Sequence, residues 1–465
     1  MTSYHVEVKN VKGLKELKVT FDFSERNTIV VTGKNGAGKT TLVKAFKLIS
    51  DPQVFKRTSS LSSIRADSSI EFSLDDQSSF SFSYNEKLRV LDTKQKLPYK
   101  NSVTSELPIP YGDRFQQFSL VARYDSEIRA NIASSDYQEA SDLRDFLSMV
   151  YPENERLDHL KSTKFKKYQF YFILQYDDYY IREDHFSSGE FFLIQLYRLI
   201  TSGAKLIVID ELDISLDASA QVHFFSAIDP LLKKYNSNLI FVSHSLALME
   251  TVHEGDLYYL EMKNEGTTLE QRSFGYIKSD LYGFRSRDRF ILTEDEVLVG
   301  FIEYVIKSNN ITTFFKYEII AVGGQPQIDA ITRKNDEHEI FGPPQHVIVV
   351  VDRDIIDKIR YAGDTKIYAS PVDDIEVFIW SNRENFLTDV QLDEFTPAKR
   401  DKDTAKTYWG KVINSRQKTR EELYQIVIDN NVAPTNKLMD ALRNHLCLPS
   451  TDQPHQKWTD QEASG

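Results

Sequence analysis

Cysteine is nearly absent from this sequence, since Cys447 is the only one among 465 residues. One cysteine excludes an internal disulfide framework and a Cys-rich zinc site, and it fits a reducing cytoplasm. The sequence also lacks any apolar stretch near the roughly 20 residues that a membrane-spanning helix needs, which argues against a membrane transporter. Its first ten residues, MTSYHVEVKN, show no charged-then-apolar signal region. We therefore expect a cytoplasmic protein with no membrane partner.

Basic residues are in deficit, with 57 Lys and Arg against 69 Asp and Glu and a formal net charge of -12. This balance argues against nonspecific adhesion of the whole surface to nucleic acid. Any such contact must use a local basic patch or a bound metal ion. No heptad run is present either, which excludes long coiled-coil arms. The length predicts about two or three domains.

The most informative motif is GKNGAGKTT at Gly33–Thr41, which follows the apolar run 28–31. It fits GxxxxGK[ST] between a strand and a helix, where glycines let backbone N–H groups surround a phosphate chain. Lys39 can reach the β and γ phosphates, and the Thr40 hydroxyl can ligate Mg²⁺. A chance glycine-rich turn is the alternative. The predicted ATP-binding residues of this loop are Gly33, Lys34, Asn35, Gly36, Ala37, Gly38, Lys39, Thr40 and Thr41.

Three further motifs follow at suitable spacings. The apolar strand 206–209 ends in Asp210, which suits a water-mediated hold on Mg²⁺, and Glu211, which suits polarising the attacking water. Ser187–Glu190 (SSGE) opens a predicted helix, and the strand 239–242 is followed by Ser243 and His244. Each motif alone is weak, because SSGE is also a common helix cap and a lone histidine is usually structural.

In this order, the motifs and the opening segment 6–14 resemble the ABC-type ATPases of the SMC/RecF/OLD group. The resemblance implies a head-to-head homodimer, or a higher even-numbered oligomer, with ATP at the interface. Ser188 and Gly189 of one protomer would then touch the γ-phosphate held by the other, and His244 would be the switch histidine. Segment 215–217 would be the loop between the two sites, and the glutamine-loop residue would be Gln116 or Gln117.

A second α/β pattern begins at Phe290. Continuous apolar runs at 290–293, 317–322 and 347–351 alternate with helical segments and predict a parallel sheet, whose ligands lie at the carboxyl ends of the strands. Glu294, Asp352 and Asp354 all fall at that edge, where they would repel one another unless a divalent cation neutralised them. The alternative is that these acids cap helices, as Asp295 could, or form a surface turn with an internal ion pair.

This second pattern resembles a Toprim domain, with a glutamate after one strand, here Glu294, and DxD after a later one. Segment 373–378 is similar to the acidic helix of OLD-type Toprim nucleases. The OLD-family arrangement, an ATPase followed by Toprim, would cover about 380 residues. Two departures stand out: Asp295 replaces the usual glycine, and Leu298 replaces the expected second glutamate. The resemblance implies a Mg²⁺ or Mn²⁺ site at Glu294, Asp352 and Asp354. Because of the departures, either Asp295, Glu296 or Glu376 is recruited as a ligand instead, or one metal position is weakened.

The predicted fold class is α/β, with an ABC-type ATPase, a flanking antiparallel sheet, a parallel Toprim sheet and a C-terminal helical region. Alternating residues between 67 and 92 predict the antiparallel strands, and segment 143–180 predicts a small helical insert. The expected domain limits are 1–275 for the ATPase, 276–384 for Toprim, 385–448 for a helical extension and 449–465 for a disordered tail. The densest basic region, 399–420, includes Tyr408 and Trp409. It is either a nucleic-acid surface or a solvated helix face, because acids interrupt it.

These patterns lead to the hypothesis of an ATP-gated, metal-dependent nuclease that acts on nucleic acid. Proteins with a similar arrangement are commonly antiphage defence effectors, some encoded beside the reverse transcriptase and noncoding RNA of a retron. One alternative is an ATP-driven scaffold or sensor whose Toprim domain is degenerate and binds a partner without cleaving it. Another is a RecF-like repair clamp, which needs only the ATPase and duplex DNA binding.

Overall fold

The chain divides into two units, Met1–Ile277 and Lys278–Gly465, in a computed structural model. The structure describes residues 3–59, 63–74, 78–95, 97, 102–107, 116–175, 179–211, 213–253, 255–263, 266–283, 287–361, 363–388, 390 and 400–448. The predicted C-terminal tail lies outside these residues. Among the residues that the structure describes, no helix combines the length and the apolar character that crossing a membrane requires.

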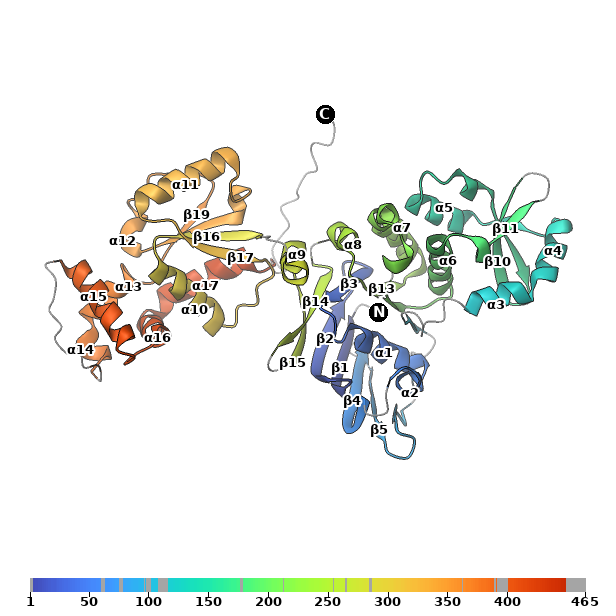
Figure 1. Ribbon diagram of the computed structural model, residues 1–465, viewed down its shortest axis with the longest axis horizontal. Helices are drawn as coiled ribbons and strands as arrows, with labels where there is room; N and C mark the ends of the chain where they lie inside the picture. Colours follow the sequence, from blue (N-terminus) through green and yellow to red (C-terminus); the bar gives the residue numbers. More distant parts are fainter. Residues whose placement is uncertain are drawn as a thin grey trace. The chain divides into compact units, whose positions relative to one another are not determined.

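The first unit is built on a six-stranded sheet with the order β15-β14-β3-β13-β12-β7 (Figure 1). Its strands are β3 (Thr28–Gly33), β7 (Val103–Glu106), β12 (Leu206–Asp210), β13 (Asn238–Val242), β14 (Leu257–Lys263) and β15 (Gly266–Gln271). All neighbours are parallel except β14 and β15. Strands β3, β12 and β13 are buried throughout, which explains their continuous apolar sequences.

Helices cover both faces of this sheet. On one face Val31, Val208 and Ile240 join the core that contains α1 (Lys39–Ser50). On the other face the ring of Phe241 lies 5.9 Å from that of Phe224, in α7 (Ala218–Tyr235). Two more helices are connected to the strands of this sheet: α6 (Ser188–Thr201) precedes β12, and α8 (Leu246–Thr251) follows β13.

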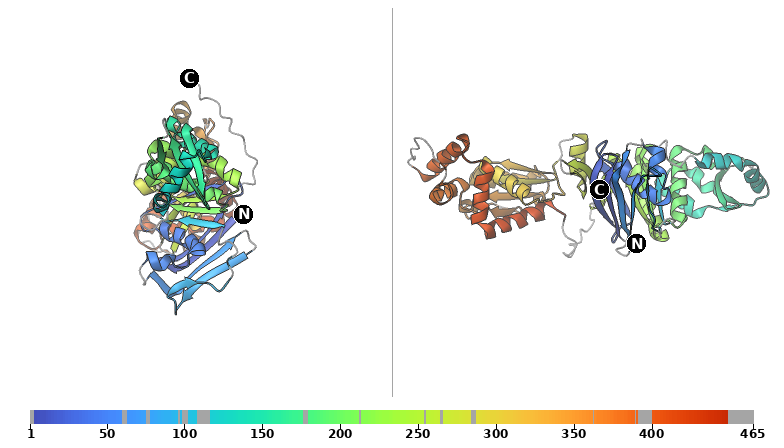
Figure 2. Two further views of the ribbon diagram at one scale, coloured as in Figure 1. Left: turned by 90° about the vertical axis from the view of Figure 1, so that its right-hand side faces the viewer. Right: turned by 90° about the horizontal axis from the view of Figure 1, so that it is seen from below.

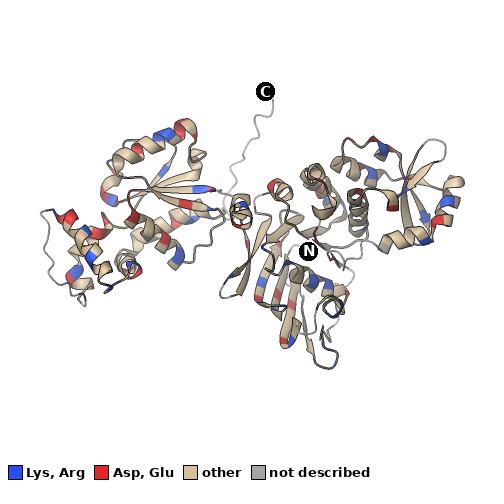
Figure 3. Cartoon of the chain, in the orientation of Figure 1, with Lys and Arg blue, Asp and Glu red and all other residues tan. Residues whose placement is uncertain are grey.

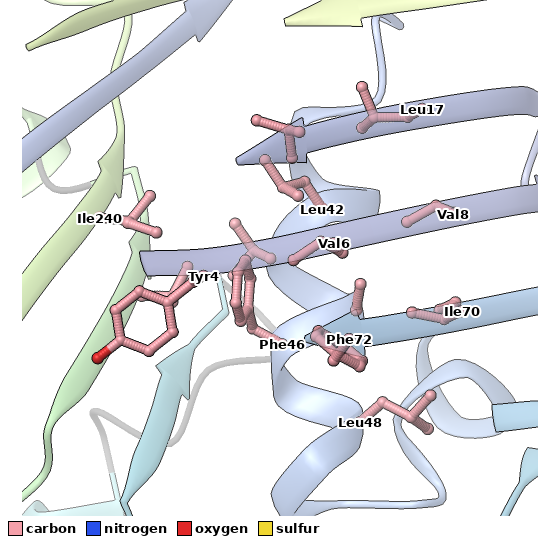
Figure 4. Close-up of a cluster of buried hydrophobic side chains, with 14 of the residues drawn as sticks. Tyr4, Val6, Val8, Leu17, Leu42, Phe46, Leu48, Ile70, Phe72 and Ile240 are labelled. Carbon is pink, nitrogen blue, oxygen red and sulfur yellow. The ribbon is translucent and has the colours of Figure 1, made fainter. Parts of the chain in front are cut away.

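An antiparallel sheet with the order β2-β1-β4-β5-β6 flanks this core. Its strands are β1 (Ser3–Val11), β2 (Leu14–Asp22), β4 (Ile64–Leu74), β5 (Ser78–Asn85) and β6 (Val90–Asp92), and the short α2 (Val54–Thr58) follows α1. Residues alternate between buried and exposed along β1, so Val6 and Val8 pack with Phe46 of α1 and Phe72 of β4 (Figure 4). The flanking antiparallel sheet was predicted, and the structure confirms it.

The insert between β7 and α6 corrects the prediction of a helical segment at 143–180. It contains α3 (Gln116–Arg123), α4 (Asp125–Ala133), α5 (Ser141–Val150) and the antiparallel strands β8 (Gln138–Glu139), β9 (Leu160–Phe165), β10 (Tyr168–Leu174) and β11 (Tyr180–Arg182). Among the described residues of the predicted range, 143–175 and 179–180, only those of α5 are α-helical. The teal segments of Figures 1 and 2 show α3, α4 and these strands gathered at one end of the first unit.

The second unit contains the predicted parallel sheet, with the order β17-β16-β18-β19. Its strands are β16 (Arg289–Thr293), β17 (Tyr317–Ala321), β18 (Val347–Val351) and β19 (Lys366–Ala369). Alternate residues face opposite sides: Ile291 and Val350 join the core of α10 (Glu296–Ser308), whereas Leu292 packs with Ile328 of α11 (Gln325–His338). Both faces of the sheet are therefore covered.

The C-terminal helices do not form a separate extension. They are α13 (Ile375–Ser381), α14 (Arg383–Phe386), α15 (Asp401–Asn414), α16 (Arg420–Asn430) and α17 (Val432–Leu446). Tyr424 of α16 donates a hydrogen bond to the carbonyl oxygen of Val297 at 3.0 Å, and its ring lies 5.6 Å from that of Phe301. The helical character at 385–448 was predicted, but these helices share one core with α10 and the sheet.

Candidate functional sites

The glycine-rich loop lies between β3 and α1, as the motif predicts. Gly36 and Gly38 have φ angles of 82° and 108°, a conformation that glycine adopts without steric cost. A Cβ atom at Gly38 would lie 2.7 Å from a methyl carbon of Leu14, and one at Gly33 would collide with the carbonyl oxygen of Leu260. Glycine is therefore required at positions 33 and 38 by close packing, and at 38 by backbone conformation as well.

Lys39 is the first residue of α1 and is only 8% exposed. Its Nζ donates hydrogen bonds to the carbonyl oxygens of Gly33, at 2.6 Å, and Lys34, at 2.9 Å. Burial lowers the pKa of Lys39, and the charges of Asp210 and Glu211 oppose that shift. Anionic phosphate oxygens are stronger acceptors for an ammonium group than the two neutral carbonyls it contacts. Thr40 and Thr41 follow in the first turn of α1.

Asp210 and Glu211 lie at the carboxyl end of β12, which β13 separates from β3. The parallel strands bring these acids and the glycine-rich loop to the same edge of the sheet. Asp210 is buried, whereas Glu211 is half-buried and has a left-handed φ of 57°. The Glu211 N–H donates to the carbonyl oxygen of Val242 at 3.1 Å. A strained backbone at a carboxylate beside a phosphate loop is typical of a functional position.

Ser188 and Gly189 begin α6, and Ser187 caps it. Glu190 completes the capping box and is held by Arg156 at 2.5 Å and by Asn154 at 2.7 Å. Ser188 is exposed at this helix N-terminus. Its neighbour Gly189 is buried, and a Cβ atom there would collide with the hydroxyl of Tyr151 and lie 2.9 Å from the carbonyl oxygen of Ser215.

His244 follows β13, and the next residue along the chain, Ser245, is linked to the loop at 215–217 through hydrogen bonds. Ser245 caps α8 and is hydrogen-bonded to Gln221. Gln221 Nε2 in turn donates to the carbonyl oxygen of Leu216 at 2.8 Å, and Asp217 caps α7. These contacts connect two of the segments that the motifs singled out.

One of the two glutamine-loop candidates, Gln117, is hydrogen-bonded within the insert. Gln117 Nε2 donates to Oε1 of Glu183 at 3.0 Å, and Arg198 pairs with the same buried carboxylate at 2.6 Å. Burial raises the pKa of Glu183 despite the charge of Arg198. Gln117 therefore stabilises a buried polar cluster in the insert, and the side chain of Gln116 lies outside the described residues.

The carboxylates of the second unit gather at the carboxyl ends of β16 and β18. The backbone N–H of Asp352 donates to Oε1 of Glu294 at 3.0 Å, so residues 58 positions apart are in contact. Asp295 instead caps α10, with its Oδ1 accepting from the N–H groups of Val297 and Leu298 at 3.0 Å each. The helix-cap alternative is thus correct for Asp295.

Asp374 and Glu376 complete this group, which we call the carboxylate cluster: Glu294, Asp352, Asp354, Asp374 and Glu376. Burial raises the pKa of Asp352 to about 8, and the charges of Asp374 and Glu294 add to the shift. Burial also raises the pKa of Glu376, to about 7, and that of Glu294. Glu376 is only 7% exposed, so it is not an ordinary solvated helix residue.

Two lysines form ion pairs with this cluster. Lys402 Nζ lies 3.2 Å from Asp354 and 3.4 Å from Asp374, and Lys358 lies 3.6 Å from Asp354. Burial lowers the pKa of Lys402, but its bonds to Asp354 and Asp374 outweigh that effect and raise it. The predicted internal ion pair within Asp352–Asp354 is not formed, because Arg353 bonds the carbonyl oxygen of Pro371 instead.

The chemistry of the carboxylate cluster fits a hard divalent cation, although its side chains are not already arranged around one. Within the described ranges, no three His, Cys, Asp or Glu side chains are grouped as ligands for a metal ion. However, Oδ1 of Asp354 is buried and accepts no hydrogen bond from any described residue. Carboxylate oxygens are also the ligands that Mg²⁺ and Mn²⁺ prefer. Metal binding by Glu294, Asp352, Asp354 and Glu376 stays a prediction.

Several residues around these sites were missed by sequence reasoning. A pocket of about 420 Å³ includes Leu14, whose side chain lies against Gly38 of the glycine-rich loop; its cationic lining residues are Lys12, Lys15 and Arg65. No motif marks these cations or Lys402. Tyr408 and Trp409 are buried in the core of the second unit, so neither a nucleic-acid surface nor a solvated helix face describes these two residues. Lys399 lies outside the described residues.

The strand, glycine-rich loop and helix, with paired carboxylates two strands away, define a P-loop nucleotide-binding domain. Residues 29–250 match the family described as "AAA domain, putative AbiEii toxin, Type IV TA system". This match lies entirely within the first unit. The first unit therefore contains an ATPase domain.

Three known proteins illustrate what the chain is similar to. The chain is 23% identical over 249 residues to the "Probable metal transport system ATP-binding protein" of Thermotoga maritima. The aligned region covers 52% of this chain and 76% of that protein. The chain is also 30% identical over 107 residues to the oligopeptide transport ATP-binding protein OppF of Mycoplasma genitalium. That match covers 23% of this chain but only 11% of the OppF protein. Among solved structures, the chain is similar to an SMC head bound to the C-winged helix domain of ScpA. The sequence identity is 13% and the TM-score is 0.42. The match covers 58% of this chain and 97% of the SMC head. Both sequence relatives are described as ATP-binding proteins, which agrees with the glycine-rich loop of the first unit.

Proposed function

We propose that this protein is an ATP-gated nuclease that requires Mg²⁺ or Mn²⁺. ATP held by Lys39, Thr40 and Asp210 would join two copies of the chain, with Ser188 and Gly189 of each completing the other's site. Glu211 would polarise the attacking water, and His244 would sense the γ-phosphate. Exposure of Ser188 at a helix N-terminus supports this arrangement, because that position can meet an anion from outside the chain.

The carboxylate cluster is the observation that carries the nuclease proposal. Three of its acids have raised pKa values because they are buried beside one another, and a scaffold has no need for such crowding. Glu294, Asp352, Asp354 and Glu376 would hold Mg²⁺ or Mn²⁺, which would stabilise charge on the scissile phosphate. The parallel sheet and the position of these acids at its carboxyl edge support a Toprim-like domain of OLD type.

The biological role that we propose is antiphage defence in the cytoplasm, with a retron reverse transcriptase and its noncoding RNA as the partner complex. The description of the matching family, which names a toxin of a toxin–antitoxin system, supports a role in growth arrest or defence. This role is inferred by analogy between folds and motifs.

The experiment is cleavage of labelled plasmid, linear duplex, single-stranded DNA and RNA, with Mg²⁺ or Mn²⁺ and with or without ATP. The Asp352→Ala/Asp354→Ala double variant should abolish cleavage, whereas Asp373→Ala, an exposed acid next to Asp374, should not. Lys39→Ala should remove any dependence on ATP. Cleavage that survives in the double variant would place the nuclease site elsewhere.

The alternative is an ATP-driven scaffold or sensor with a degenerate Toprim domain. Leu298 is buried where a second glutamate is expected, and Lys402 already supplies a cation to Asp354 and Asp374. The two functions differ in metal binding. Titration of Mn²⁺ into the nucleotide-free Lys39→Ala protein should detect a site that Asp352→Ala removes, and a scaffold would show none.

A further inference from the structure

The hairpin between β9 and β10 carries three lysines at its tip, Lys164, Lys166 and Lys167, which we call the lysine hairpin. Phe165 pairs with Tyr168 across the strands, so Lys166 and Lys167 form the two-residue loop. All three lysines are exposed, and none makes an ion pair with any described residue. By contrast, Lys161 lower on the same hairpin is paired with Glu139. The tip is therefore a local group of three cations without an acidic partner among the described residues. Figure 3 marks Lys and Arg in blue along the described part of the chain.

The loop conformation is unfavourable for lysine. Lys166 has a φ of 54°, in the left-handed region that glycine, asparagine and aspartate adopt most readily. A hairpin selected only for stability would place one of those residues there. Lysines at both loop positions are thus better explained by their charge than by the turn.

Aromatic rings fix the positions of these ammonium groups. Nζ of Lys166 lies 5.3 Å from the ring centre of Phe165 and 5.7 Å from that of Tyr124, and Nζ of Lys167 lies 5.4 Å from that of Tyr168. Cation–π attraction holds an ammonium without neutralising it. The positive charges therefore remain available to an anionic partner.

Hydrogen bonds and a small hydrophobic core attach the lysine hairpin to α3 and α4. Asn131 of α4 donates hydrogen bonds to Oγ1 of Thr163 at 2.9 Å and to the carbonyl oxygen of Lys164 at 3.3 Å. Phe170 and Phe172 of β10 pack with α3 and α4 in a separate small core. A preordered cationic surface loses less conformational entropy on binding than a mobile one.

We propose that the lysine hairpin binds the phosphodiester backbone of nucleic acid. Several cations spaced along an extended tip match the repeated charges of such a backbone. The chain carries a net charge of -12, so a polyanion must dock through a local patch of this kind. Arg123, an exposed residue at the end of α3, adds a fourth cation to the insert that carries the lysine hairpin. The choice of nucleic acid over an acidic protein rests on the proposed function, whereas the docking surface lies outside both candidate sites.

The test is fluorescence anisotropy of the full chain with labelled single-stranded DNA, duplex DNA and RNA in excess EDTA. Because no divalent metal is free, the measurement reports binding whether or not the protein is a nuclease. The variant is Lys164→Gln/Lys166→Gln/Lys167→Gln. The matched control is Lys87→Gln/Arg89→Gln/Lys94→Gln, which removes three exposed cations around the β5–β6 turn of the same unit, where Arg89 also has a positive φ of 53°.

The lysine-hairpin variant should bind at least about tenfold more weakly, and its dependence of log Kd on log salt should fall by up to about 3, near 0.9 per lost phosphate contact. The Lys→Arg triple variant should keep the affinity and should melt at the wild-type temperature, which separates loss of charge from misfolding. Equal affinity of the glutamine variant and the control would overturn the proposal. So would tighter binding of poly-glutamate than of every nucleic acid, which would identify the partner as an acidic protein.

Discussion

Lys402 partly neutralises two acids of the carboxylate cluster, since its Nζ lies 3.2 Å from Asp354 and 3.4 Å from Asp374. A lysine and a divalent cation compete for the same oxygens. We therefore predict that Lys402→Met strengthens Mn²⁺ binding, by roughly threefold to tenfold, because the carboxylate cluster loses its nearest cation. Isothermal titration with Mn²⁺ measures the change.

Lys437→Met provides the control, because Lys437 is exposed on α17 and makes no ion pair within the described part of the chain. Its affinity for Mn²⁺ should equal that of the wild type. If Lys402→Met instead weakened Mn²⁺ binding, the lysine would position the carboxylates for the metal and would not compete with it.

Asp256 gives a pH dependence whose sign follows from its burial. It lines a pocket of about 350 Å³, where burial raises its pKa to about 7 although Arg26 lies 3.1 Å away. The unfolded carboxyl has a pKa of 3.8, so between about pH 4 and pH 7 only the folded state holds the proton. The free energy of unfolding that Asp256 contributes therefore falls as pH rises through that window.

We predict that Asp256→Asn stabilises the protein at pH 8, by about 1–3 kcal/mol relative to its effect at pH 4, because the amide never ionises. Urea unfolding followed by far-UV circular dichroism at both pH values gives the difference. Asp229→Asn is the control, since Asp229 lines the same pocket but pairs with Lys233 near the surface. An equal difference in both variants would mean that Asp256 titrates normally.

At the scale of elements, α6 depends on a glycine at its second residue. A Cβ atom at Gly189 would collide with the hydroxyl of Tyr151 and press on the carbonyl oxygen of Ser215. Gly189→Ala should therefore lower stability by about 1–3 kcal/mol, the usual cost of overpacking. Tyr151→Phe in the same chain should recover part of the loss, because it removes the hydroxyl and leaves the carbonyl. Thermal melting of the two single variants and the double variant measures this coupling.

Gly410→Ala is the matched control for that series. Gly410 lies within α15, and a Cβ atom there would meet nothing within 4 Å. Alanine should stabilise the helix by about 0.5–1 kcal/mol. A similar destabilisation at both positions would show that packing against Tyr151 is not the cause.

The elements that sequence reasoning predicted correctly have strong local signals. Strands β3, β12 and β18 are continuous apolar runs that end in glycine or acids, so their type and their functional edge follow from the sequence. Hairpin β9–β10 was missed because its turn is Lys166-Lys167, without the glycine or asparagine that usually marks one.

The candidate sites show the same division. Glu294 and Asp352 could be placed at one sheet edge because parallel strands align their carboxyl ends. The approach of Lys402 to Asp374, the N-cap of α13, depends instead on how α15 packs against α13, which amphipathic periodicity does not specify. A helical pattern indicates that a face is buried but not what covers it, which is why Tyr408 and Trp409 were misassigned.

At the scale of the whole molecule, each unit has a core of its own. Residues such as Phe46 and Phe72 belong to the core of the first unit, whereas Trp409 and Tyr424 belong to that of the second. Each unit therefore contains one candidate site and the hydrophobic interior that supports it. A ligand bound at one site therefore raises the free energy of unfolding of the unit that contains the site. It leaves that of the other unit unchanged, unless the two units unfold together.

This separation predicts different responses to ATP, which tryptophan can report. The three tryptophans all follow residue 378, and Trp380 and Trp409 pack in the core of the second unit. With Trp458→Phe as the background, Trp fluorescence follows only the second unit during urea unfolding, whereas far-UV circular dichroism follows both units. ATP with Mg²⁺ at about 100 times Kd should stabilise the first unit by about 2.7 kcal/mol. The dichroism transition should then shift to higher urea while the fluorescence transition stays in place. When Lys39→Ala is added to this background, ATP should move neither the dichroism transition nor the fluorescence transition. A shift of both transitions in the Trp458→Phe protein itself would show that the two units unfold cooperatively.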